Sequence, residues 1–382
     1  MRLHPDRDLD LHEAEQKLPK YEQLKNHLLG ELRAGRLRPG EALPTELELA
    51  GTLQIARSTV RRALDDLGRE GLINRVRGRG TFISRDARRR MHSGLNAFAL
   101  MVPETQGGHY PALLHGFEGA ASRAHNQMLV SSTDNDVGRQ GNIILQLLEK
   151  EVAGVAMVPA TTPPTPAYQL VPLQRQGIPL VFCHRPVEGI QAPLLAIPFH
   201  EVCRMAGEAL VAHGHRRVAY MSTRQEKTSE IYLQELRKTV RDAGGDVPET
   251  FIFQGKGISP HVERLENEFR EALGRMFSGP DRPTAIFSTF DSAAELIYLI
   301  LGQMGLRVPE DVSLVGFGGT DRRGAILSRL TSVAISGEEL GRRAGEILQE
   351  IRLGLRPAND NEAIHMPLML IEGQTLGPAR NT

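Results

Sequence analysis

The sequence predicts an α/β protein with two unequal parts, a small N-terminal domain of helices ending in a hairpin and a larger domain of two doubly wound lobes. Two observations support this prediction. Residues 43–83 combine two short amphipathic helical patterns with two strand-like runs separated by glycines. Beyond residue 96, apolar strand-like runs alternate with helical stretches of ten or more residues, which is the pattern of buried parallel sheets.

A capping box marks the start of the first helix of the 43–83 segment. Thr45 is followed three residues later by Glu48, so each side chain can satisfy an amide that the helix leaves free. Leu47, Ala50 and Leu53 then supply apolar residues at helical spacing. We expect these three side chains to form the buried stripe of this helix.

The second helix of the segment has apolar residues at the i, i+3, i+4 and i+7 positions starting from Val60, and Gly71 suits its C-terminal cap. Its polar face begins with Arg57, Ser58 and Thr59 and continues with two more arginines. Two helices joined by a tight turn, the second with arginines and hydroxyls at its N-terminal end, form the helix-turn-helix that enters a DNA major groove.

A hairpin follows the second helix. Residues 72–77 and 80–83 are the expected strands, and Gly-Arg-Gly at 78–80 is the turn, which together make a wing that can reach a phosphate or the minor groove. Residues 57–90 contain eleven arginines and four acidic residues, a net charge of +7, whereas the whole chain is formally neutral. This uneven charge predicts a nucleic-acid-binding head; the alternative is a solvated charged surface.

The head closely resembles the winged helix-turn-helix of GntR-type bacterial transcription regulators over residues 18–84. The resemblance lies in an ordered set of pieces: a leading helix at 21–32, Pro-Gly at 39–40, Leu-Pro-Thr-Glu at 43–46, Arg-Ser-Thr-Val-Arg-Arg-Ala-Leu at 57–64, Glu-Gly-Leu at 70–72 and Gly-Arg-Gly-Thr-Phe-Ile at 78–83. Leu47 stands where the family usually has an arginine, which puts one DNA contact in doubt. The resemblance implies operator DNA as partner and these contact residues: Thr45, Arg57, Ser58, Thr59, Arg61, Arg62, Arg77, Gly78 and Arg79.

The remaining segments are simpler. We interpret residues 1–17, which are charged and lack the apolar region of a signal peptide, as a disordered leader, and residues 85–95 as a basic linker that either adds phosphate contacts or is a plain hinge. No apolar run approaches the 18 residues of a membrane-spanning helix. The two cysteines show no spacing pattern, as expected for reduced thiols in a bacterial cytoplasm.

The larger domain alternates expected strands and helices. The strands are expected at 97–102, 127–131, 154–158, 179–183, 217–221, 250–253, 284–288 and 313–317, and the helices at 111–124, 143–151, 201–213, 230–243, 261–277 and 292–304. Two consecutive sets of such units predict two doubly wound lobes. Small molecules bind such folds at the carboxyl ends of the strands, which here meet in a cleft between the lobes.

Residues 96–375 resemble the effector-binding and dimerisation domain of LacI-type repressors, which is related to periplasmic sugar-binding proteins. The resemblance lies in Val-Ala-Met-Val-Pro at 155–159, Gly-Ile-Pro-Leu-Val-Phe-Cys-His-Arg-Pro at 177–186, Gly-His-Arg-Arg-Val-Ala-Tyr at 214–220, Pro-Thr-Ala-Ile-Phe-Ser at 283–288, residues 305–317 and 330–333, and Leu-Gly at 340–341. A GntR-type head on a LacI-type sensor is similar to the arabinose-repressor branch of regulators. The resemblance implies that the chain crosses between lobes near Ile197, Ile335 and Ile364.

The sensor departs from its sugar-binding relatives. They usually hold hydroxyls with an Asp where this chain has His184, an Arg near Tyr232, an Asn at Phe290 and an Asp at Gly318, and only Asp291 keeps its expected place. A free hexose or pentose is therefore not expected, because too few polar contacts remain to offset its desolvation. Aromatic side chains could stack on a flatter ligand, and His109, His184 and Arg185 could take a carboxylate or phosphate. The candidate effector residues are His109, Tyr110, His184, Arg185, Tyr232, Phe290 and Asp291.

Several alternatives stay open for single residues. Phe290 is either core or ligand platform, and Asp291 either caps the helix that starts at Ser292 or contacts the ligand. His213 and His215 have no third ligand in range for a metal, so helix-end capping is expected. The sequence contains no G-x-x-x-x-G-K-[ST], H-E-x-x-H or G-x-S-x-G motif, and we expect neither enzyme activity nor a cofactor.

The sequence therefore predicts a cytoplasmic, dimeric transcription regulator, a repressor, whose sensor binds a small molecule and changes operator affinity. Three rivals remain: a regulator with a degenerate sensor that only dimerises, an architectural DNA-binding protein, and an exported binding protein, against which the missing signal peptide argues. A sugar derivative or another metabolite is the expected effector, and no membrane partner is expected.

Overall fold

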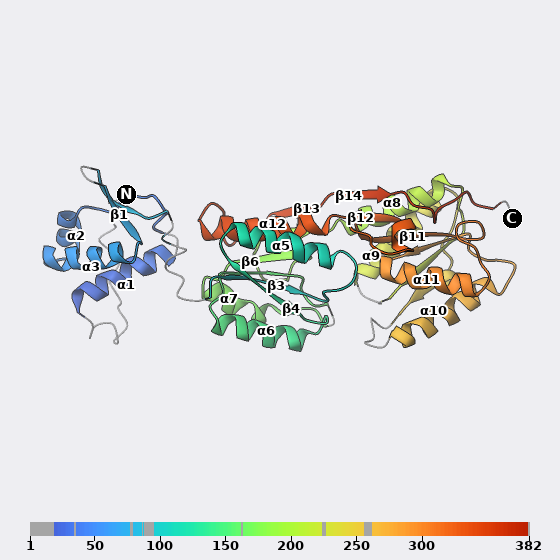
Figure 1. Ribbon diagram of the computed structural model, residues 1–382, viewed down its shortest axis with the longest axis horizontal. Coiled ribbons are helices and arrows are strands. Elements are labelled where there is room, and N and C mark those ends of the chain that lie inside the picture. Colours follow the sequence, from blue (N-terminus) through green and yellow to red (C-terminus); the bar gives the residue numbers. More distant parts are fainter. Residues whose placement is uncertain are drawn as a thin grey trace.

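The computed structural model describes residues 19–380 apart from 34–35, 77–78, 86, 88–94, 162, 224–226 and 256–261. The proposed leader at 1–17, most of the proposed linker, and the wing residues Arg77 and Gly78 therefore lie outside the described residues. Figure 1 shows a small head at one end of the molecule, followed by two lobes along the longest axis.

The head has the predicted winged helix-turn-helix architecture. Its elements are α1 (Lys20–Arg33), α2 (Glu46–Thr52), α3 (Arg57–Arg69) and the antiparallel hairpin of β1 (Ile73–Val76) and β2 (Gly80–Ile83). The capping box is confirmed, because Thr45 accepts a hydrogen bond from the Glu48 amide and the Glu48 carboxylate accepts one from the Thr45 amide. Gly71 takes the left-handed conformation, with φ of 70°, directly after the last turn of α3.

The predicted buried stripe of α2 is wrong at one position. Leu47 is 69% exposed, whereas Leu49 is only 2% exposed and packs into the head core with Ala50 and Leu53 at its edge. Leu47 lies three residues before Ala50, and Leu49 lies four residues before Leu53, so either leucine fits a helical stripe. A helix of two turns is too short for spacing alone to decide between them. The packing of α2 on α3 decides the outcome and leaves Leu47 on the surface. The stripe of α3 is confirmed, since all four of its apolar residues are buried.

Lobe 1 is a six-stranded sheet in the order β13-β7-β6-β5-β3-β4, with all strands parallel. Its elements are β3 (Ala97–Val102), α5 (Tyr110–Arg123), β4 (Gln127–Ser132), α6 (Val137–Glu149), β5 (Gly154–Met157), the 3-10 helix η2 (Ala167–Gln169), α7 (Val171–Arg175), β6 (Leu180–His184), β7 (Leu194–Ala196), α12 (Gly337–Arg352) and β13 (Ala363–His365). Helices α5 and α12 lie against one face of this sheet and α6 and α7 against the other (Figure 1).

Lobe 2 is a second six-stranded sheet in the order β14-β12-β11-β10-β8-β9, parallel except for the antiparallel edge strand β14. Its elements are α8 (Phe199–Ala212), β8 (Val218–Ser222), α9 (Lys227–Asp242), η3 (Glu249–Phe251), β9 (Ile252–Gln254), α10 (Val262–Phe277), β10 (Ala285–Ser288), α11 (Asp291–Gln303), β11 (Ser313–Gly319), η4 (Leu327–Arg329), β12 (Thr331–Ile335) and β14 (Leu368–Ile371).

The predicted strands and helices of the sensor are present, with shifts at their ends. Helix α6 begins six residues earlier than expected, because Asp136 caps it by accepting a hydrogen bond from the Arg139 amide. The first part of the strand expected at 250–253 is the 3-10 helix η3. The short strands β7, β13 and β14 were not predicted, since three or four residues carry too little periodicity to stand out.

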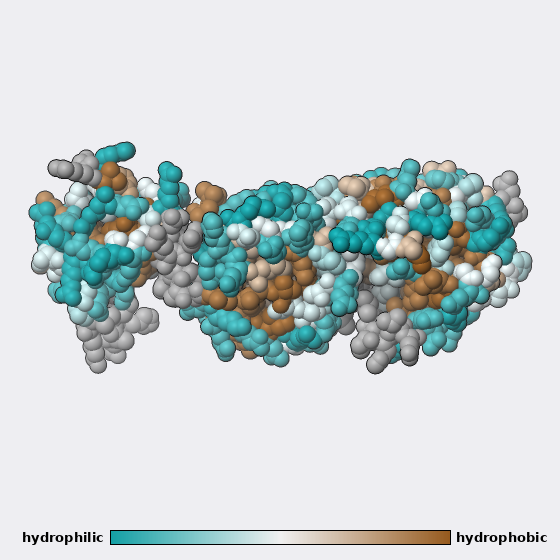
Figure 2. Space-filling view, in the orientation of Figure 1, coloured by the Kyte–Doolittle hydropathy of each residue, from teal (hydrophilic) through white to brown (hydrophobic). Residues whose placement is uncertain are grey.

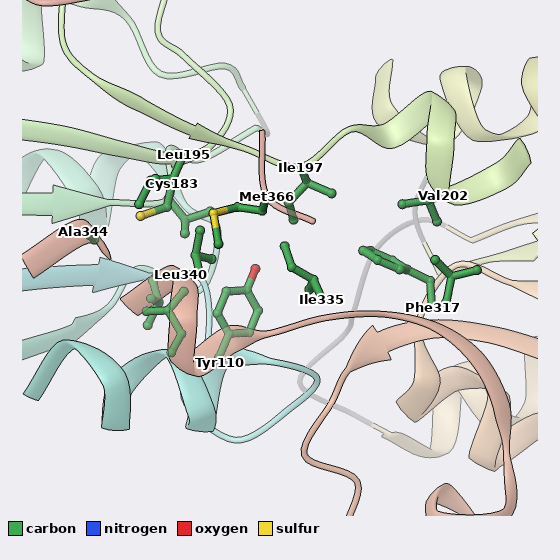
Figure 3. Packing of buried hydrophobic residues seen from close by; sticks show 14 of the residues in the cluster. Tyr110, Cys183, Leu195, Ile197, Val202, Phe317, Ile335, Leu340, Ala344 and Met366 are labelled. Carbon is green, nitrogen blue, oxygen red and sulfur yellow. The ribbon is translucent and has the colours of Figure 1, made fainter. Parts of the chain in front are cut away.

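The chain passes between the lobes at three places, after β7, after β12 and after β13, each within a few residues of the expected position. Figure 3 shows Ile197, Ile335 and Met366 at these crossings, and all three belong to one hydrophobic cluster that continues from lobe 1 into lobe 2. The lobes therefore share an apolar hinge. A closely packed pair of helices, α5 and α12, borders this hinge in lobe 1.

Glycines set the distance between α5 and α12. A Cβ on Gly341 would lie 2.0 Å from the carbonyl oxygen of Leu113, and one on Gly337 would lie 2.2 Å from that of His109. Such distances are possible only for glycine, so the two backbones pack in direct contact. This packing fixes the N-terminal end of α5, where His109 and Tyr110 are placed. Among the described residues, no helix is long and apolar enough to cross a membrane.

Candidate DNA-binding face and effector cleft

The N-terminal end of α3 presents the polar surface of the head. Arg57, Ser58, Arg61 and Arg62 are exposed and Thr59 is half-buried. The N-cap of α3 is Ala56, which makes no side-chain capping hydrogen bond. The amides of the first turn and the partial positive charge of the helix end are thus available to a phosphate.

Glu46 lies at the centre of this surface, and sequence reasoning did not single it out. Its carboxylate accepts hydrogen bonds from Arg61, at 3.1 and 3.2 Å, and from Arg57 at 3.4 Å. A third arginine, Arg75 of β1, has its guanidinium 3.6 Å from the same carboxylate. Hydrogen bonding from Arg61, followed by its charge and that of Arg57, holds the pKa of Glu46 below its ordinary value. Glu46 therefore orients Arg57 and Arg61 side by side in the free protein.

The other predicted DNA-contact residues differ in their surroundings. Thr45 is exposed and is already the cap of α2. The guanidinium of Arg62 lies 3.8 Å from the centre of the Tyr21 ring of α1, so this arginine also ties α3 to α1. Arg79 is exposed in the turn of the wing. Arg77 and Gly78, predicted beside it, fall outside the described residues.

A cleft opens between the lobes where the strands of both sheets end. The space within it is about 650 Å³ with its open mouth included. Six of the seven predicted effector residues line it; Asp291 does not. The lining comprises Pro103, Glu104, His109, Tyr110, Asn135, His184, Arg185, Ile197, Phe199, Ser222, Thr228, Ser229, Tyr232, Thr289, Phe290 and Phe317.

Two buried histidines of lobe 1 form the most unusual feature of the cleft. The Nε2 atoms of His109 and His184 lie 2.9 Å apart in a hydrogen bond, and the ring of Tyr110 packs against both imidazoles. His184 ends β6 with φ of 71°, a left-handed conformation that few non-glycine residues adopt. Burial lowers the pKa of His109 to about 4. Burial, together with the charges of His109 and Arg185, holds the pKa of His184 well below its ordinary value. Both rings are therefore neutral at pH 7.

Arg185 follows His184 and lines the same wall. It is half-buried, its Nε is buried without a hydrogen-bond partner, and no ion pair is formed by it among the described residues. An uncompensated guanidinium beside a cleft is costly unless something binds it. Glu104 is the acidic residue of the lining, on the same lobe.

Lobe 2 contributes rings and hydroxyls. Tyr232 is buried and packs edge-on against Phe199, with ring centres 5.6 Å apart, and against Phe317, at 6.0 Å. Phe290 is half-buried, packs against the lobe 2 core and also lines the cleft, so its core packing is confirmed and its role as a ligand platform stays a prediction. The hydroxyls come from Ser222, Thr228, Ser229 and Thr289, which lie at strand ends or in the first turn of α9.

Asp291 lies behind the cleft wall. Its Oδ1 accepts a hydrogen bond from Ser332 at 2.7 Å, and Oδ2 is buried without a partner. The carboxylate fills the space left by Gly316 and Gly318, where an added Cβ would lie 2.3 and 2.2 Å from its oxygens. Burial raises the pKa of Asp291 to about 6, although the Ser332 hydrogen bond opposes the shift. The capping alternative is wrong, because Phe290 is the N-cap of α11 and Asp291 is its first residue.

The two histidines that flank Gly214 are structural. His213 is the C-cap of α8, and its Nδ1 is hydrogen-bonded to the Ala209 carbonyl at 2.8 Å, which confirms the helix-end interpretation for this residue. His215 instead ties the C-terminal segment to lobe 2 through Thr284, Ser313 and the Gly377 carbonyl. Within the described part of the chain, no group of three or more His, Cys, Asp or Glu residues could hold a metal ion.

Four of the lining residues that sequence reasoning missed share one signal. Pro103, Asn135, Ser222 and Thr289 all lie at or just after the carboxyl end of a strand. The rule that ligands bind at these ends would have found them once the strands had been located. Ile197 and Phe317 also lie near strand ends, but an apolar residue there is equally expected in the core, as is Phe199 at the start of α8.

Comparisons with known proteins agree with this architecture. Residues 20–83 match the gntR family of bacterial regulatory proteins, and residues 208–376 match the periplasmic binding protein-like domain. An arabinose metabolism transcriptional repressor of Geobacillus stearothermophilus is 26% identical over 368 residues, covering 94% of this chain and 99% of that protein. A repressor of the same description from Halalkalibacterium halodurans is 23% identical, covering 93% and 96%.

Solved structures resemble the sensor fold. A LacI family transcriptional regulator from Mycobacterium smegmatis superposes with a TM-score of 0.60 at 24% identity, covering 74% of this chain and 99% of that chain. At this identity the likeness establishes the fold alone. The chain therefore joins a head that matches the gntR family of bacterial regulatory proteins to a two-lobed domain that matches the periplasmic binding protein-like domain, and it is similar along nearly its whole length to transcriptional repressors.

Proposed function

We propose that this protein is a cytoplasmic repressor that binds operator DNA as a homodimer and changes its DNA affinity when a small molecule enters the cleft. The observation that carries the proposal is the presence, in one chain, of an arginine-rich winged helix-turn-helix and a two-lobed domain with a cleft beside its hinge. The similarity to repressors along nearly the whole chain supports it.

On DNA, Arg57 and Arg61 read base edges or fix phosphates, while Thr45, Ser58 and Thr59 donate hydrogen bonds to phosphates. The exposure of the arginines and the uncapped end of α3 support this assignment. In the wing, Arg77, Gly78 and Arg79 supply the flanking contact. Arg62 also contacts DNA, in addition to packing on Tyr21.

The sensor provides the dimer contact. Large apolar side chains are exposed on both lobes, among them Val130 of β4, Leu145 of α6 and Leu299 of α11. Figure 2 shows hydrophobic residues gathered over the middle of lobe 1, whereas the visible face of the head is mostly hydrophilic. Such a patch is typical of a surface that a second subunit covers. Two heads then reach half-sites about one helical turn apart, or a multiple of it.

Effector binding acts through the hinge. Gly319, at the end of β11 in lobe 2, lies against His109 of lobe 1, and a Cβ on it would be 3.1 Å from the His109 Cα. The lobes thus touch beside the cleft, and a ligand that contacts both walls changes their relative position. Movement of the lobes alters the spacing of the heads and so the affinity for DNA.

The test is a selection of operator DNA from a random library by the full-length protein, followed by binding measurements on the selected sequence. We expect a roughly palindromic site, bound by a dimer, and release or tightening in the presence of a compound that stabilises the sensor. If no DNA sequence is preferentially selected, the proposed role as an operator-binding regulator is wrong. If a sequence is selected but no sensor ligand changes the affinity for it, the protein is a DNA-binding dimer and the proposed effector control is wrong.

A further inference from the structure

The geometry points to an effector with one carboxylate, held by Arg185 and the His109–His184 pair, and a flat apolar body that packs on Tyr232, Phe199 and Phe290. This inference rests on the proposed role of the cleft as effector site and names the chemical class of the effector.

The histidine pair fixes what the lobe 1 wall can offer. Two neutral imidazoles carry two N–H groups and two acceptor nitrogens, and the hydrogen bond between the Nε2 atoms uses one of each. One Nδ1–H and one Nδ1 acceptor remain on the pair. The pair can therefore donate to a ligand oxygen without first taking up a proton.

Arg185 supplies the permanent positive charge of the same wall. Its buried Nε has no partner, and the guanidinium can meet a planar carboxylate with two parallel N–H groups. One guanidinium and one imidazole N–H match the lone pairs of a single carboxylate. Glu104 on the same lobe opposes further negative charge, which disfavours a doubly charged phosphate monoester.

The helix ends around the cleft add to this preference. His109 is the N-cap of α5 and Phe290 is the N-cap of α11, and neither residue makes a side-chain capping hydrogen bond. The N-terminal turn of α9 contributes Thr228 and Ser229 to the lining. Three helices thus direct their partial positive ends at one space, which favours an anion there.

The cleft suits a polyhydroxylated ligand poorly. Both ends of the Asn135 amide are hydrogen-bonded to Thr161, and the Ser229 hydroxyl is bonded to Tyr220 and Gln254. Sugar hydroxyls would have to replace these bonds to recover their hydration. The opposite wall offers ring faces and edges, which favour a flat apolar body.

The first experiment measures thermal stabilisation of the full-length protein by acids and their neutral amides. The probes are benzoate, cinnamate and nicotinate with benzamide, cinnamamide and nicotinamide, together with phenyl phosphate, arabinose and glucose. We expect at least one carboxylate to raise the melting temperature while its amide does not. Failure of all the acids, equal stabilisation by an acid and its amide, or stabilisation by phenyl phosphate or a sugar in place of the acids would overturn the inference.

The second experiment uses charge variants with the acid that binds. Arg185→Gln should weaken its binding about tenfold or more, because a charge-assisted hydrogen bond is lost. Glu104→Gln should strengthen binding, since it removes a nearby negative charge. Arg175→Gln, at an exposed arginine of lobe 1 outside the lining, is the matched control and should leave binding unchanged. Unchanged affinity in Arg185→Gln, or weaker binding in Glu104→Gln, contradicts the assignment.

The two proposals fail in distinguishable ways. If a neutral sugar binds and alters operator affinity, effector control stands and the carboxylate assignment is wrong. If an acid binds in an Arg185-dependent manner but leaves operator affinity unchanged, the assignment of the ligand class stands and effector control is wrong.

Discussion

The candidate DNA-binding face and the candidate effector cleft differ in how they hold charge. The face of the head presents permanently charged arginines to solvent, oriented by a single carboxylate, Glu46. In the cleft, the buried pair His109 and His184 is neutral and bonded to each other, and the charge of Arg185 is half-buried. Exposed permanent charge attracts a polyanion over a distance and loses its effect in salt, whereas buried neutral groups act only on a ligand that touches them.

The salt dependence of DNA binding is the strongest test of this contrast. Affinity of the full-length protein for its operator should fall about a thousandfold from 50 to 200 mM salt if six or more phosphates are neutralised, because counterions are released from the DNA. Fluorescence anisotropy at a series of salt concentrations measures the slope. Binding of the effector acid to the cleft serves as the comparison and should change far less, because a single carboxylate carries no condensed counterions to release. A flat salt response for DNA would show that the arginine face is not the DNA-binding surface.

Removal of single arginines should have the next largest effect. Arg57→Ala or Arg61→Ala should lower specific operator affinity about a hundredfold, since each loses a charge-assisted contact and disturbs its partner on Glu46. Arg69→Ala, at the far end of the same helix, is the matched control. The melting temperature should stay unchanged in all three, because none of these side chains is buried. Unfolding of the Arg57 or Arg61 variant with normal operator binding in the folded fraction would make these residues structural.

Close helix packing supports the cleft but not the head. Gly341→Ala places a methyl group 2.0 Å from the Leu113 carbonyl oxygen and should destabilise the sensor by about 2–4 kcal/mol. Gly274→Ala, in an exposed turn of α10 with nothing within 4 Å, should stabilise by about 0.5–1 kcal/mol. Chemical denaturation of full-length variants, with DNA binding by the head as a second readout, tests both. Equal stability of the Gly341 variant and the wild type would mean that α5 and α12 separate easily.

Acid should destabilise the sensor through its buried histidines. Burial lowers the pKa of His109 and of His215 to about 4, so the unfolded chain takes up protons before the folded one does. Their stabilising effect is complete above about pH 6.5 and is lost as the pH falls toward 4, on the order of 2–3 kcal/mol for each. Urea unfolding at several pH values measures this slope. His109→Gln should reduce it, whereas His200→Gln, at an exposed histidine, should not.

Asp291 should show the opposite pH dependence with the smallest effect. Its pKa is raised to about 6, so the folded state loses stability as the pH rises from about 4 to 6 and the buried carboxyl ionises. Asp291→Asn keeps an acceptor for Ser332 and should be more stable than the wild type by about 1–2 kcal/mol at pH 7.5, but not at pH 4. Asp242→Asn, at an exposed residue, is the control. A gain at both pH values would mean that the charge is not the cause.

Local sequence alone determined the head and the alternation of the sensor. The capping box at Thr45, the four apolar residues of α3 and the glycines of the wing act within one or two helical turns, so their effect on the backbone is readable without the fold. Strands of a parallel sheet that is covered on both faces appear in the sequence as continuous apolar runs, so they can also be located without knowledge of the fold. Candidate cleft residues could be predicted where they directly follow such a strand, as His184 and Arg185 do.

Tertiary structure decided the remainder, because those features depend on residues far apart in the chain. Only packing of α2 on α3 turns Leu47 outward, and only the approach of β1 and α3 brings Arg75 and Arg61 to Glu46. Asp291 folds behind β11 because two glycines there leave it space. The pairing of His109 with His184 joins residues 75 positions apart, and burial rather than residue type makes both neutral.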